Sequence, residues 1–448
     1  MGKVFVGPRL RALRTDRRMS QVELAALLEI SPSYLNQIEH NQRPLTVPVL
    51  LRLTEAFGVD PEFFAPEDDT RLVADLREAL ADTGVSPTAL ADLVSGGPEI
   101  ARAVVALHRR YQAATEHAAV LAGAQQSAPA PYEQVRDFFY DRNNHIDPLD
   151  RAAEALADGA DPAALVERRL AAHGVRITAS PTARRHYDPE TRVLAISPRL
   201  SRAQRAFQLA TQLAFLEHDG LLTELVATAD LDPQARALTR IGLANYFAGA
   251  FILPYGAFRA AAEDYRYDID RLADRFGVGF ETVCHRLSTL QRPRARGVPF
   301  SFVRVDRAGN ISKRQSATGF HFTRAGGTCP LWNVYEAFTS PGSLLTQVAE
   351  MPDGRRYFWI ARTVHRPAAR YGGVGQTFAL GLGCELRHAH RLVYADGFAL
   401  AAPITVPIGL GCKVCDRTSC PQRAFPPTGV TTAVTEHESP LTPYAPPD

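Results

Sequence analysis

Three cysteines near the end of the chain have the spacing of metal ligands. Cys412, Cys415 and Cys420 fall within nine residues, and Pro421 follows the last of them. Two cysteines separated by two residues place both sulfurs on one side of a tight turn, where they can bind one metal centre. A third cysteine four residues later, followed by proline, is a common way to complete an iron–sulfur site. Cys384 lies upstream and is the candidate fourth ligand.

The spacing alone leaves three alternatives open for these four cysteines: a structural zinc ion, an iron–sulfur cluster or free thiols. His388 and His390 are alternative ligands, because Cys384 has no second cysteine two residues away. Cys284 and Cys329 lie in apolar or turn contexts, which is typical of structural thiols.

The overall composition limits the functions that the chain can have. A length of 448 residues exceeds what one core supports, so we expect three or four domains. The net charge is only +2, so any nucleic-acid binding must depend on a local patch. No apolar run approaches the roughly 18–20 residues of a membrane span, and the first residues lack a signal-peptide pattern. We therefore expect no membrane partner and a cytoplasmic, nucleoid-associated protein whose thiols stay reduced.

Hydrophobic periodicity and turn residues divide the chain into five parts. We expect a DNA-binding domain at 1–66, a helical connector or dimerisation element at 70–125, a helical middle domain at 132–292, an α+β domain with the cysteine site at 297–425 and a disordered tail at 426–448. The predicted fold class is therefore multidomain and mostly α, with an α+β C-terminal domain.

Short segments support this division. Ile100, Val104, Leu107 and Tyr111 have helical spacing in the connector. Turn residues at 188–191 predict a hairpin near 187–196. Alternating apolar residues at 300–305 and 357–364 predict strands.

The N-terminal part contains two short helices joined by a tight turn. Ser20 and Glu23 match the S-x-x-E pattern of a capping box, so a helix should begin at Gln21. Ser31 is a good N-cap, and Pro32 suits the first position of a second helix. This is the helix-turn-helix pattern, in which the second helix lies in the major groove of DNA.

Polar and basic residues of this module suit contacts with bases and phosphates. The candidate DNA-binding residues are Gln21, Ser31, Ser33, Tyr34, Asn36, Gln37, Asn41 and Arg43. Leu35 and Ile38 should instead face the core. Residues 1–52 contain eight Lys/Arg and four Asp/Glu, so this module has the local positive charge that the whole chain lacks. The alternative is a small helical bundle with no role in DNA binding.

The module also resembles a known family. Ser20-Gln-Val-Glu-Leu-Ala, followed by Ser31-Pro-Ser-Tyr-Leu-Asn-Gln-Ile-Glu-His-Asn-Gln-Arg-Pro44, is similar to the phage-repressor (Cro/C1-type, XRE) helix-turn-helix family. The resemblance covers about 60 residues and implies binding to double-stranded operator DNA.

The middle domain resembles a zinc metallopeptidase family of phage-repressor-cleaving enzymes. The matching segments are 205–215 and 244–254. In that family the first segment carries H-E-x-x-H on a helix, where two histidines bind zinc and the glutamate activates water. Here the aligned residues are Thr211-Gln-Leu-Ala-Phe215, and Ile241-Gly-Leu243 before the second segment has no carboxylate. We therefore expect a degenerate peptidase-like domain without zinc, and no enzyme activity.

A domain that has lost its catalytic residues can keep its cleft as a small-molecule pocket. Arginines are dense in this part, and some can hold a phosphorylated ligand through bidentate contacts. We take Arg169, Arg199 and Tyr246 as the candidate contacts; a solvated arginine surface and a core tyrosine are the alternatives.

Together the three parts resemble the short-chain fatty acyl-CoA-responsive transcriptional regulators, a family that includes regulators of propionate (methylcitrate cycle) and acetate/glyoxylate metabolism. The resemblance covers residues of about 9–425. Its most specific pieces are the helix-turn-helix, the ligandless peptidase-like domain, Gly326-Gly-Thr-Cys-Pro-Leu-Trp332 with Ala337-Phe338, and Cys412-x2-Cys415-x4-Cys420-Pro-x-Arg-Ala-Phe-Pro-Pro427.

We expect a homodimeric regulator, and the resemblance implies that its operator binding responds to an acyl-CoA, propionyl-CoA or acetyl-CoA, bound in the middle domain. It also implies a 4Fe-4S cluster, with zinc as the alternative, held by Cys384, Cys412, Cys415 and Cys420. Two other functions remain open: a peptidase-type anti-repressor enzyme with an unusual metal site, and a phage-type repressor without a small effector.

Overall fold

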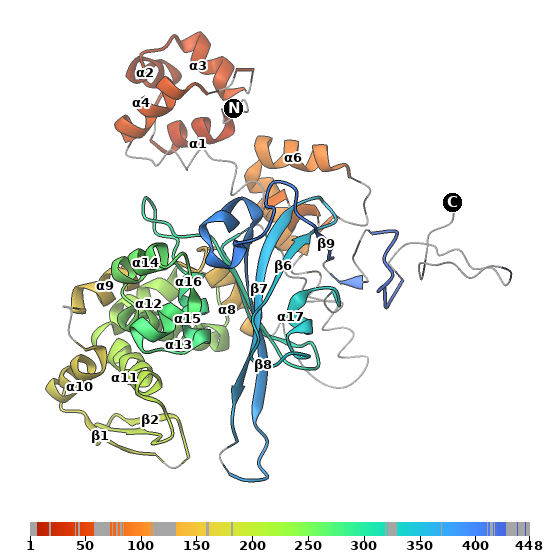
Figure 1. Ribbon diagram of the computed structural model, residues 1–448. Coiled ribbons are helices and arrows are strands. Elements are labelled where there is room, and N and C mark those ends of the chain that lie inside the picture. The colour runs from red at the N-terminus through yellow and green to blue at the C-terminus, as the bar shows by residue number, and fades with distance from the viewer. Residues whose placement is uncertain are drawn as a thin grey trace. The chain divides into compact units, whose positions relative to one another are not determined.

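The computed structural model in Figure 1 describes residues 7–57, 72–108, 111, 131–426, 437 and 444, apart from gaps at 18, 41, 44, 74, 78, 81–82, 84, 158–160, 181, 319, 321–328, 369, 410, 413–414 and 416. Asn41 and most of the tail predicted at 426–448 lie outside the described residues. The chain forms two compact units, Met1–Ala128 and Pro129–Asp448, each of which is described by itself.

The first unit begins with the helices predicted for DNA binding. They are α1 (Gly7–Asp16), α2 (Gln21–Leu27), α3 (Pro32–Glu39) and α4 (Val47–Phe57). The capping box confirms the predicted start of α2: the Glu23 amide donates to the Ser20 hydroxyl at 3.2 Å, and the Ser20 amide donates to the Glu23 carboxylate at 2.7 Å. Ser31 caps α3 by accepting from the Tyr34 amide at 3.1 Å.

The turn between α2 and α3 is held by one arginine. Glu29 has φ 49°, in the left-handed region that few residues other than glycine adopt. Arg52 of α4 donates to the Leu28 carbonyl at 2.8 Å, and its guanidinium lies 2.9 Å from the Glu29 carboxylate. Leu35 and Ile38 are fully buried, as predicted, so α3 is fixed by its inner face and presents its outer face to solvent.

The connector forms a second small core within this unit. It includes α6 (Pro87–Gly96), and its buried apolar residues are Leu76, Leu90, Val94, Ala101 and Val105. Of the residues predicted at helical spacing, Val104 packs partly against this core. Ile100, Leu107 and Tyr111 are each more than 60% exposed, so they form an apolar stripe on the surface of the described connector.

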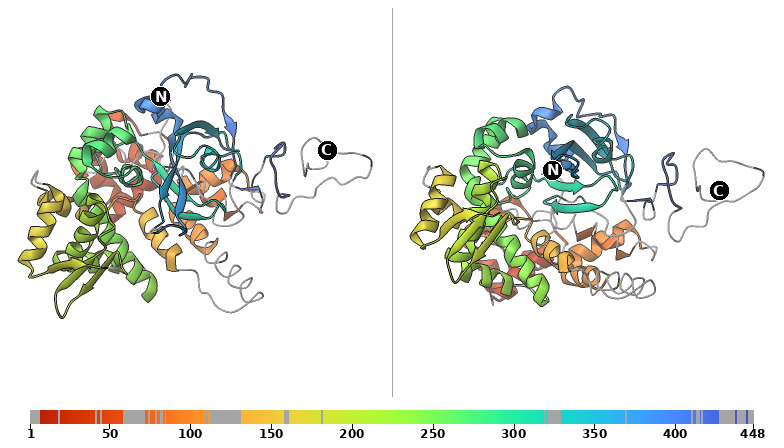
Figure 2. Two further views of the ribbon diagram at one scale, coloured as in Figure 1. Left: turned by 60° about the horizontal axis from the view of Figure 1, so that its bottom comes forward. Right: turned by 90° about the horizontal axis from the view of Figure 1, so that it is seen from below.

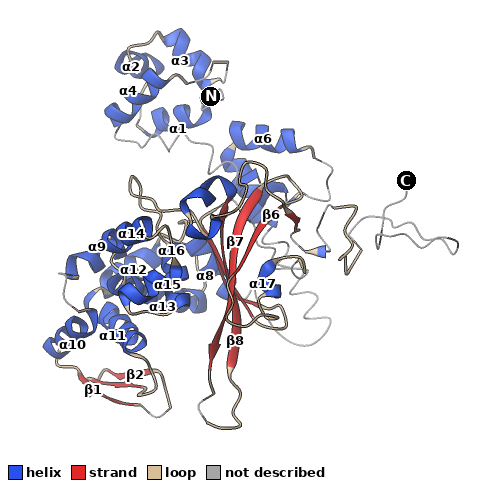
Figure 3. Ribbon diagram, viewed as in Figure 1, coloured by secondary structure: helices blue, strands red, loops and turns tan. Residues whose placement is uncertain are grey.

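The second unit begins with a helical body (Figures 1 and 3). Its helices are α8 (Pro131–Tyr140), α9 (Asp147–Leu156), α10 (Pro162–Ala172), α11 (Arg202–Glu217), α12 (Asp219–Ala227), α13 (Pro233–Ile252), α14 (Tyr255–Asp264), α15 (Ile269–Phe276) and α16 (Phe280–Leu287). Among the described residues no single helix is long and apolar enough to cross a membrane. The bent pair α13–α14 meets the length and composition together, at an angle of 60°.

A small sheet lies on the side of the helical body away from the larger sheet (Figures 1 and 2). Its strands are β1 (Arg176–Ala179), β2 (Arg185–Asp188) and β3 (Val193–Ile196), in the order β1-β3-β2. β2 and β3 pair antiparallel, which confirms the predicted hairpin. The Asp188 carboxylate accepts from the Thr191 hydroxyl at 2.6 Å and closes the turn.

The larger sheet has six strands, β5-β4-β8-β7-β6-β9. They are β4 (Ser301–Val305), β5 (Ile311–Ser316), β6 (Leu345–Glu350), β7 (Arg356–Arg366), β8 (Gln376–Glu385) and β9 (Val406–Pro407), and they confirm the two predicted strand segments. The pairs are antiparallel except β6–β9. Two 3-10 turns follow β8, η3 (Leu386–Arg391) and η4 (Val393–Ala395).

The two faces of this sheet pack against different partners. One face, with Phe358, Ile360 and Leu382, joins the core of the helical body. The other face carries Trp359 under the short helix α17 (Asn333–Glu336). Gly383 allows this packing, because a Cβ there would lie 2.5 Å from the Trp359 ring. Side chains alternate between the faces, so neighbours in sequence belong to different cores.

The helical body and the sheet were predicted as separate domains, but they share one core. Val298 and Phe300, at the start of the predicted C-terminal domain, are fully buried in the core that also contains residues of α9–α16. The reason is that the inner faces of α13–α16 and of the sheet are both apolar and cover each other.

Candidate functional site

The outer face of α3 carries most of the predicted DNA contacts. Ser31, Ser33, Asn36 and Arg43 are exposed, whereas Gln21, Tyr34 and Gln37 are half-buried. The Arg43 guanidinium lies over the Tyr34 ring, 5.6 Å from its centroid. The structure therefore brings seven of the eight candidates together on one surface of the first unit, and Asn41 lies outside the described residues.

Side chains behind α3 fix the orientation of Asn36. The Gln21 amide nitrogen donates to the Asn36 side-chain oxygen at 3.3 Å and to the Glu39 carboxylate at 2.7 Å. Glu39 is buried and also accepts from Arg14 at 2.7 Å. Burial raises the pKa of Glu39, but bonds from Arg14 and Gln21 outweigh this effect and lower the pKa. With its oxygen already bonded, the Asn36 amide can donate to a base edge.

The cysteine site requires a correction, because Cys384 does not lie with the other three predicted ligands. It is fully buried on β8, opposite Phe358, on the face of the sheet that packs against the helical body. Burial and the nearby Glu385 carboxylate raise the pKa of its thiol. The prediction of Cys384 as a ligand was therefore wrong, since the period of two along β8 points it away from the cysteine loop.

Cys329 takes the place expected for Cys384. It lines one pocket together with Cys412, Cys415 and Cys420. Cys329 belongs to the core on the opposite face of the sheet from Cys384. The prediction of a purely structural thiol at Cys329 missed this grouping. The sequence held a signal: Cys329-Pro330 repeats the Cys-Pro pair of Cys420-Pro421, within a segment already singled out as specific.

The environment of these thiols fits a metal centre. Backbone N–H groups point at the sulfurs: Ala424 N lies 3.4 Å from Cys412 Sγ, Gly409 and Leu331 donate to Cys329, and Arg417 donates to Cys415. Burial raises the pKa of the Cys329 and Cys415 thiols, and these backbone donors oppose that shift by favouring the thiolate, the form that binds metal. Gly409 itself is required, because a Cβ there would lie 2.5 Å from Cys415 Sγ.

Four thiols around one pocket suit zinc or an iron–sulfur cluster equally well. Among the described His, Cys, Asp and Glu side chains, no three converge closely enough to hold an ion as they stand. The thiols would therefore have to rotate toward one point when they bind. His388 and His390 follow β8 in η3 and do not line this pocket.

In α11 the positions that carry the zinc-binding histidines of the peptidase family are occupied by Thr211 and Phe215. Thr211 is buried and donates to the Phe207 carbonyl at 2.8 Å, with Asn245 at 3.3 Å. Phe215, one turn later, faces Arg185 of β2, whose guanidinium carbon lies 5.4 Å from the ring centroid. An arginine thus lies beside the helix position where the peptidase family has its second histidine.

Two of the three predicted acyl-CoA contacts are already engaged. Arg169 forms a double hydrogen bond with Glu217, with its nearest distance at 2.9 Å, and Glu217 also contacts His173 at 2.9 Å. Burial raises the pKa of Glu217, but Arg169 and His173 outweigh it and lower the pKa. Arg199 is exposed. The structure therefore does not bring the predicted trio together.

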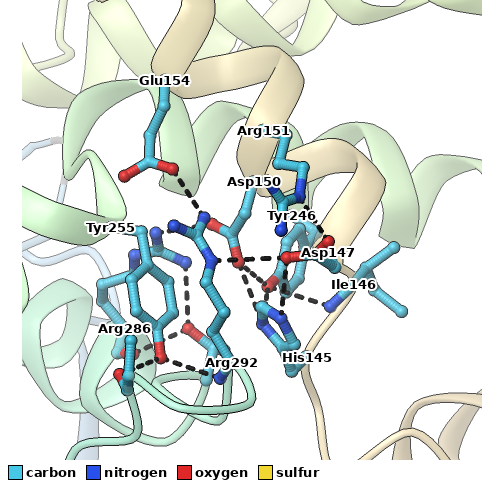
Figure 4. Close-up of polar contacts among 12 residues, drawn as sticks. His145, Ile146, Asp147, Asp150, Arg151, Glu154, Tyr246, Tyr255, Arg286 and Arg292 are labelled. Carbon is cyan, nitrogen blue, oxygen red and sulfur yellow. Dashed lines mark hydrogen bonds and ion pairs between the residues drawn. The ribbon is translucent and has the colours of Figure 1, made fainter. Parts of the chain in front are cut away.

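Tyr246 belongs instead to a buried polar network (Figure 4). Its hydroxyl donates to Asp150 at 2.6 Å and accepts from the Ile146 amide at 3.1 Å. Asp150 also accepts from Arg286 at 2.6 Å and lies 3.0 Å from His145 Nδ1. This network joins the start of α9 to α13 and α16, so Tyr246 holds these helices together inside the core.

Arg292 extends the network along α9 and to α14. Its guanidinium donates to Glu154 at 2.6 Å, lies 3.3 Å from Asp147 and stacks 4.1 Å above the Tyr255 ring (Figure 4). Burial raises the pKa of Asp150, but the Arg286 charge and the bonds from His145 and Tyr246 outweigh it and lower the pKa to about 2. Asp150 is therefore ionised at neutral pH and balances the buried Arg286 charge.

Arg185 is a candidate ligand contact that the sequence did not single out. Burial lowers the pKa of its guanidinium, and no carboxylate contributes to that shift. Its Nη1 is buried and has no hydrogen-bond partner among the described residues. The residue as a whole is half-buried, and a partly desolvated cation without an anion favours an anionic ligand.

A helix-turn-helix module joined to a peptidase-like body without the H-E-x-x-H motif and to a cysteine-bearing sheet defines a DNA-binding transcriptional regulator. Family models agree: "Helix-turn-helix" matches residues 10–64, "IrrE N-terminal-like domain" matches 171–288, and "Short-chain fatty acyl coenzyme A regulator, C-terminal" matches 289–444. The chain belongs to the short-chain fatty acyl-coenzyme A regulator family.

Relatives cover the whole length of the chain. The HTH-type transcriptional regulators RamB and PrpR of Mycobacterium tuberculosis are 54% and 52% identical, over 99% of this chain and 99% and 96% of their own. A propionyl-CoA carboxylase regulator of Cereibacter sphaeroides is 44% identical, over 99% of this chain and 98% of its own. A solved Mycobacterium tuberculosis transcriptional regulator has a TM-score of 0.68 and 55% identity, and covers 71% of this chain and 100% of its own.

Proposed function

We propose that this regulator binds a two-fold operator as a homodimer, and that an acyl-CoA and a cysteine-bound metal centre modulate this binding. The capped, oriented helix α3 is the observation that supports the DNA-binding part most directly. The apolar stripe of Ile100, Leu107 and Tyr111 supports a dimer, since helices commonly bury such stripes against a second copy. Operator half-sites should then lie about one helical turn apart.

Asn36 and Arg43 should have different effects on DNA binding. Asn36→Ala removes an oriented amide, and should lose about 1–3 kcal/mol of discrimination at one base position. Arg43→Ala should weaken binding to all sequences alike and reduce the salt dependence, because it removes a phosphate contact. Binding-site selection and salt titrations with the full chain measure both effects. An unchanged base preference in Asn36→Ala, or a changed one in Arg43→Ala, contradicts these roles.

The effector proposal rests on the family description and on the name of the Cereibacter relative, together with Arg185. An acyl-CoA carries phosphates, and a half-buried guanidinium whose Nη1 has no hydrogen-bond partner among the described residues can bind one of them through a charge-assisted hydrogen bond. His218 lies one turn beyond Phe215, and its Nε2 is also buried without a partner among the described residues. These two groups support a ligand position between β2 and the end of α11.

Propionyl-CoA or acetyl-CoA at micromolar concentration should raise the melting temperature of the protein. Arg185→Gln should weaken the affinity by roughly 10- to 100-fold, since a hydrogen bond to a charged group contributes about 1.5–3 kcal/mol. Arg199→Gln, at an exposed arginine, is the matched control. A larger loss of affinity in Arg199→Gln than in Arg185→Gln would instead indicate that the ligand binds at Arg199. If the ligand does not raise the melting temperature of the unaltered protein, a repressor without a small effector is favoured.

The cysteine centre is proposed as a 4Fe-4S cluster, with zinc as the alternative. The four thiols and their backbone donors support either. A visible absorption spectrum of protein purified without oxygen separates the two, because iron–sulfur clusters absorb in the visible and zinc does not. The chemistry that a cluster would supply is reversible one-electron exchange, which would make DNA binding sensitive to redox state.

A further inference from the structure

Arg423 is a buried cation that no carboxylate balances among the described residues. Only 5% of its surface is exposed, in a segment without regular secondary structure. Its guanidinium donates to backbone carbonyls: Cys412 O at 2.7 Å, Cys415 O at 3.0 Å, Arg417 O, and Phe425 O at 3.5 Å. These bonds use the four N–H groups of its two Nη atoms, and no described carboxylate compensates its charge.

The positions of these carbonyls give Arg423 a structural role in the cysteine loop. Two belong to the Cys412 and Cys415 turn, and Arg423 itself follows Cys420 by three residues. One side chain therefore ties both ends of the loop together from inside. The described part of 408–426 has no helix or strand that could hold the three sulfurs in place instead, apart from a single 3-10 residue at Cys412.

The arginines that line the pocket also fit a negatively charged metal centre bound by thiolates. Arg417 also lines the pocket, and it donates to the Ile408 carbonyl at 3.1 Å and the Glu350 carbonyl at 2.6 Å, with no ion pair to a described carboxylate. Four thiolates around a zinc ion or an oxidised 4Fe-4S core leave a double negative charge. Two arginines on the pocket wall provide the matching positive charge.

We propose that Arg423 is the positioning residue of the cysteine centre: it holds the Cys412–Cys420 loop in its binding shape and supplies a fixed countercharge to the thiolates. This inference rests on the proposed metal centre. It extends that proposal to a residue that does not bind the metal. An electron added to an iron–sulfur cluster increases its negative charge, so a nearby fixed cation makes the centre easier to reduce.

Two substitutions separate the two proposed roles of Arg423, holding the loop in its shape and supplying a positive charge. Arg423→Lys keeps the charge but cannot reach four carbonyls, because an ammonium lacks the planar fork of five donors. Arg423→Gln keeps two donors but removes the charge. Both should release metal to a chelator roughly 10- to 100-fold faster than the unaltered protein, the range typical of residues that only orient ligands. With an iron–sulfur cluster, only Arg423→Gln should shift the reduction potential clearly downward.

The experiment uses the full chain, purified without oxygen. Iron, sulfide and zinc content, the rate of metal release and the potential of any coloured centre are compared among the three proteins, and circular dichroism checks the fold. Arg356→Gln is the matched control, because Arg356 is a half-exposed arginine on β7, paired with Glu350 and away from the pocket lining.

The outcomes separate the two proposals. An unaltered protein without bound metal overturns the metal centre itself, and this inference with it. A metal-loaded unaltered protein whose Arg423 variants release metal no faster than Arg356→Gln overturns only the role of Arg423. Faster release of zinc or iron from both Arg423 variants, with retained fold, supports it.

Discussion

Cys329→Ser should abolish stable metal binding, whereas Cys384→Ser should leave it intact. Cys329 lines the pocket with the three loop cysteines, while Cys384 lies on the opposite face of the sheet. A serine oxygen is a poor substitute for a thiolate, so the loss should exceed the roughly 10- to 100-fold decrease that follows changes to residues that only orient ligands. Metal analysis and visible spectra of both variants measure it.

The two substitutions control for each other, since each replaces a buried cysteine by serine. Cys384→Ser places a hydroxyl in an apolar core and should lower thermal stability without releasing metal. Metal loss from Cys384→Ser together with retention in Cys329→Ser would restore the ligand set expected from the family resemblance. Cys412→Ser should behave like Cys329→Ser.

Asp150→Asn should destabilise the second unit by about 3–5 kcal/mol, the usual cost of leaving a buried charge without its partner. Arg286 is 3% exposed, and Asp150 is its only carboxylate partner among the described residues. The amide also loses the acceptor bonds to Tyr246 and His145. Chemical denaturation of the variant and of the unaltered protein gives the difference in free energy of unfolding.

The destabilisation should depend on pH in a defined direction. The pKa of Asp150 is lowered to about 2 in the folded protein, from 3.8. Its contribution is therefore complete above about pH 4 and is lost as the pH falls toward 2, so the variant and the unaltered protein should converge in acid. Asp396→Asn, at an exposed pair with Arg266, is the control and should change stability little. An equal effect of both substitutions would contradict the role of the buried network.

Local patterns in the sequence predicted the elements whose structure depends on near neighbours. The Ser20–Glu23 capping box and Ser31 fixed the starts of α2 and α3, and alternating residues located β4 and β7. In each case the decisive contacts span a few residues, so their spacing is visible in the chain.

The errors concern contacts between distant segments. Tyr246 meets Asp150 across 96 positions, and no periodicity reveals that pair. Side chains alternate between the two faces of the sheet along β8, and this alternation points Cys384 away from the pocket. Which residues face which side depends on the pairing of β8 with β7. Cys329 joins the loop cysteines although more than 80 residues separate them, and only its Cys-Pro pair hinted at the match. The unpaired state of Arg185 likewise becomes visible only once all of its neighbours are placed.

The core shared by the helical body and the sheet has a thermodynamic consequence. Val298 and Phe300 belong to a single apolar interior, so neither part can lose its packing while the other keeps its own. A ligand between β2 and α11 and a metal at the cysteines, both as proposed, would therefore add to one common free energy of unfolding. Two chemically unrelated ligands would in this way stabilise the same folded unit.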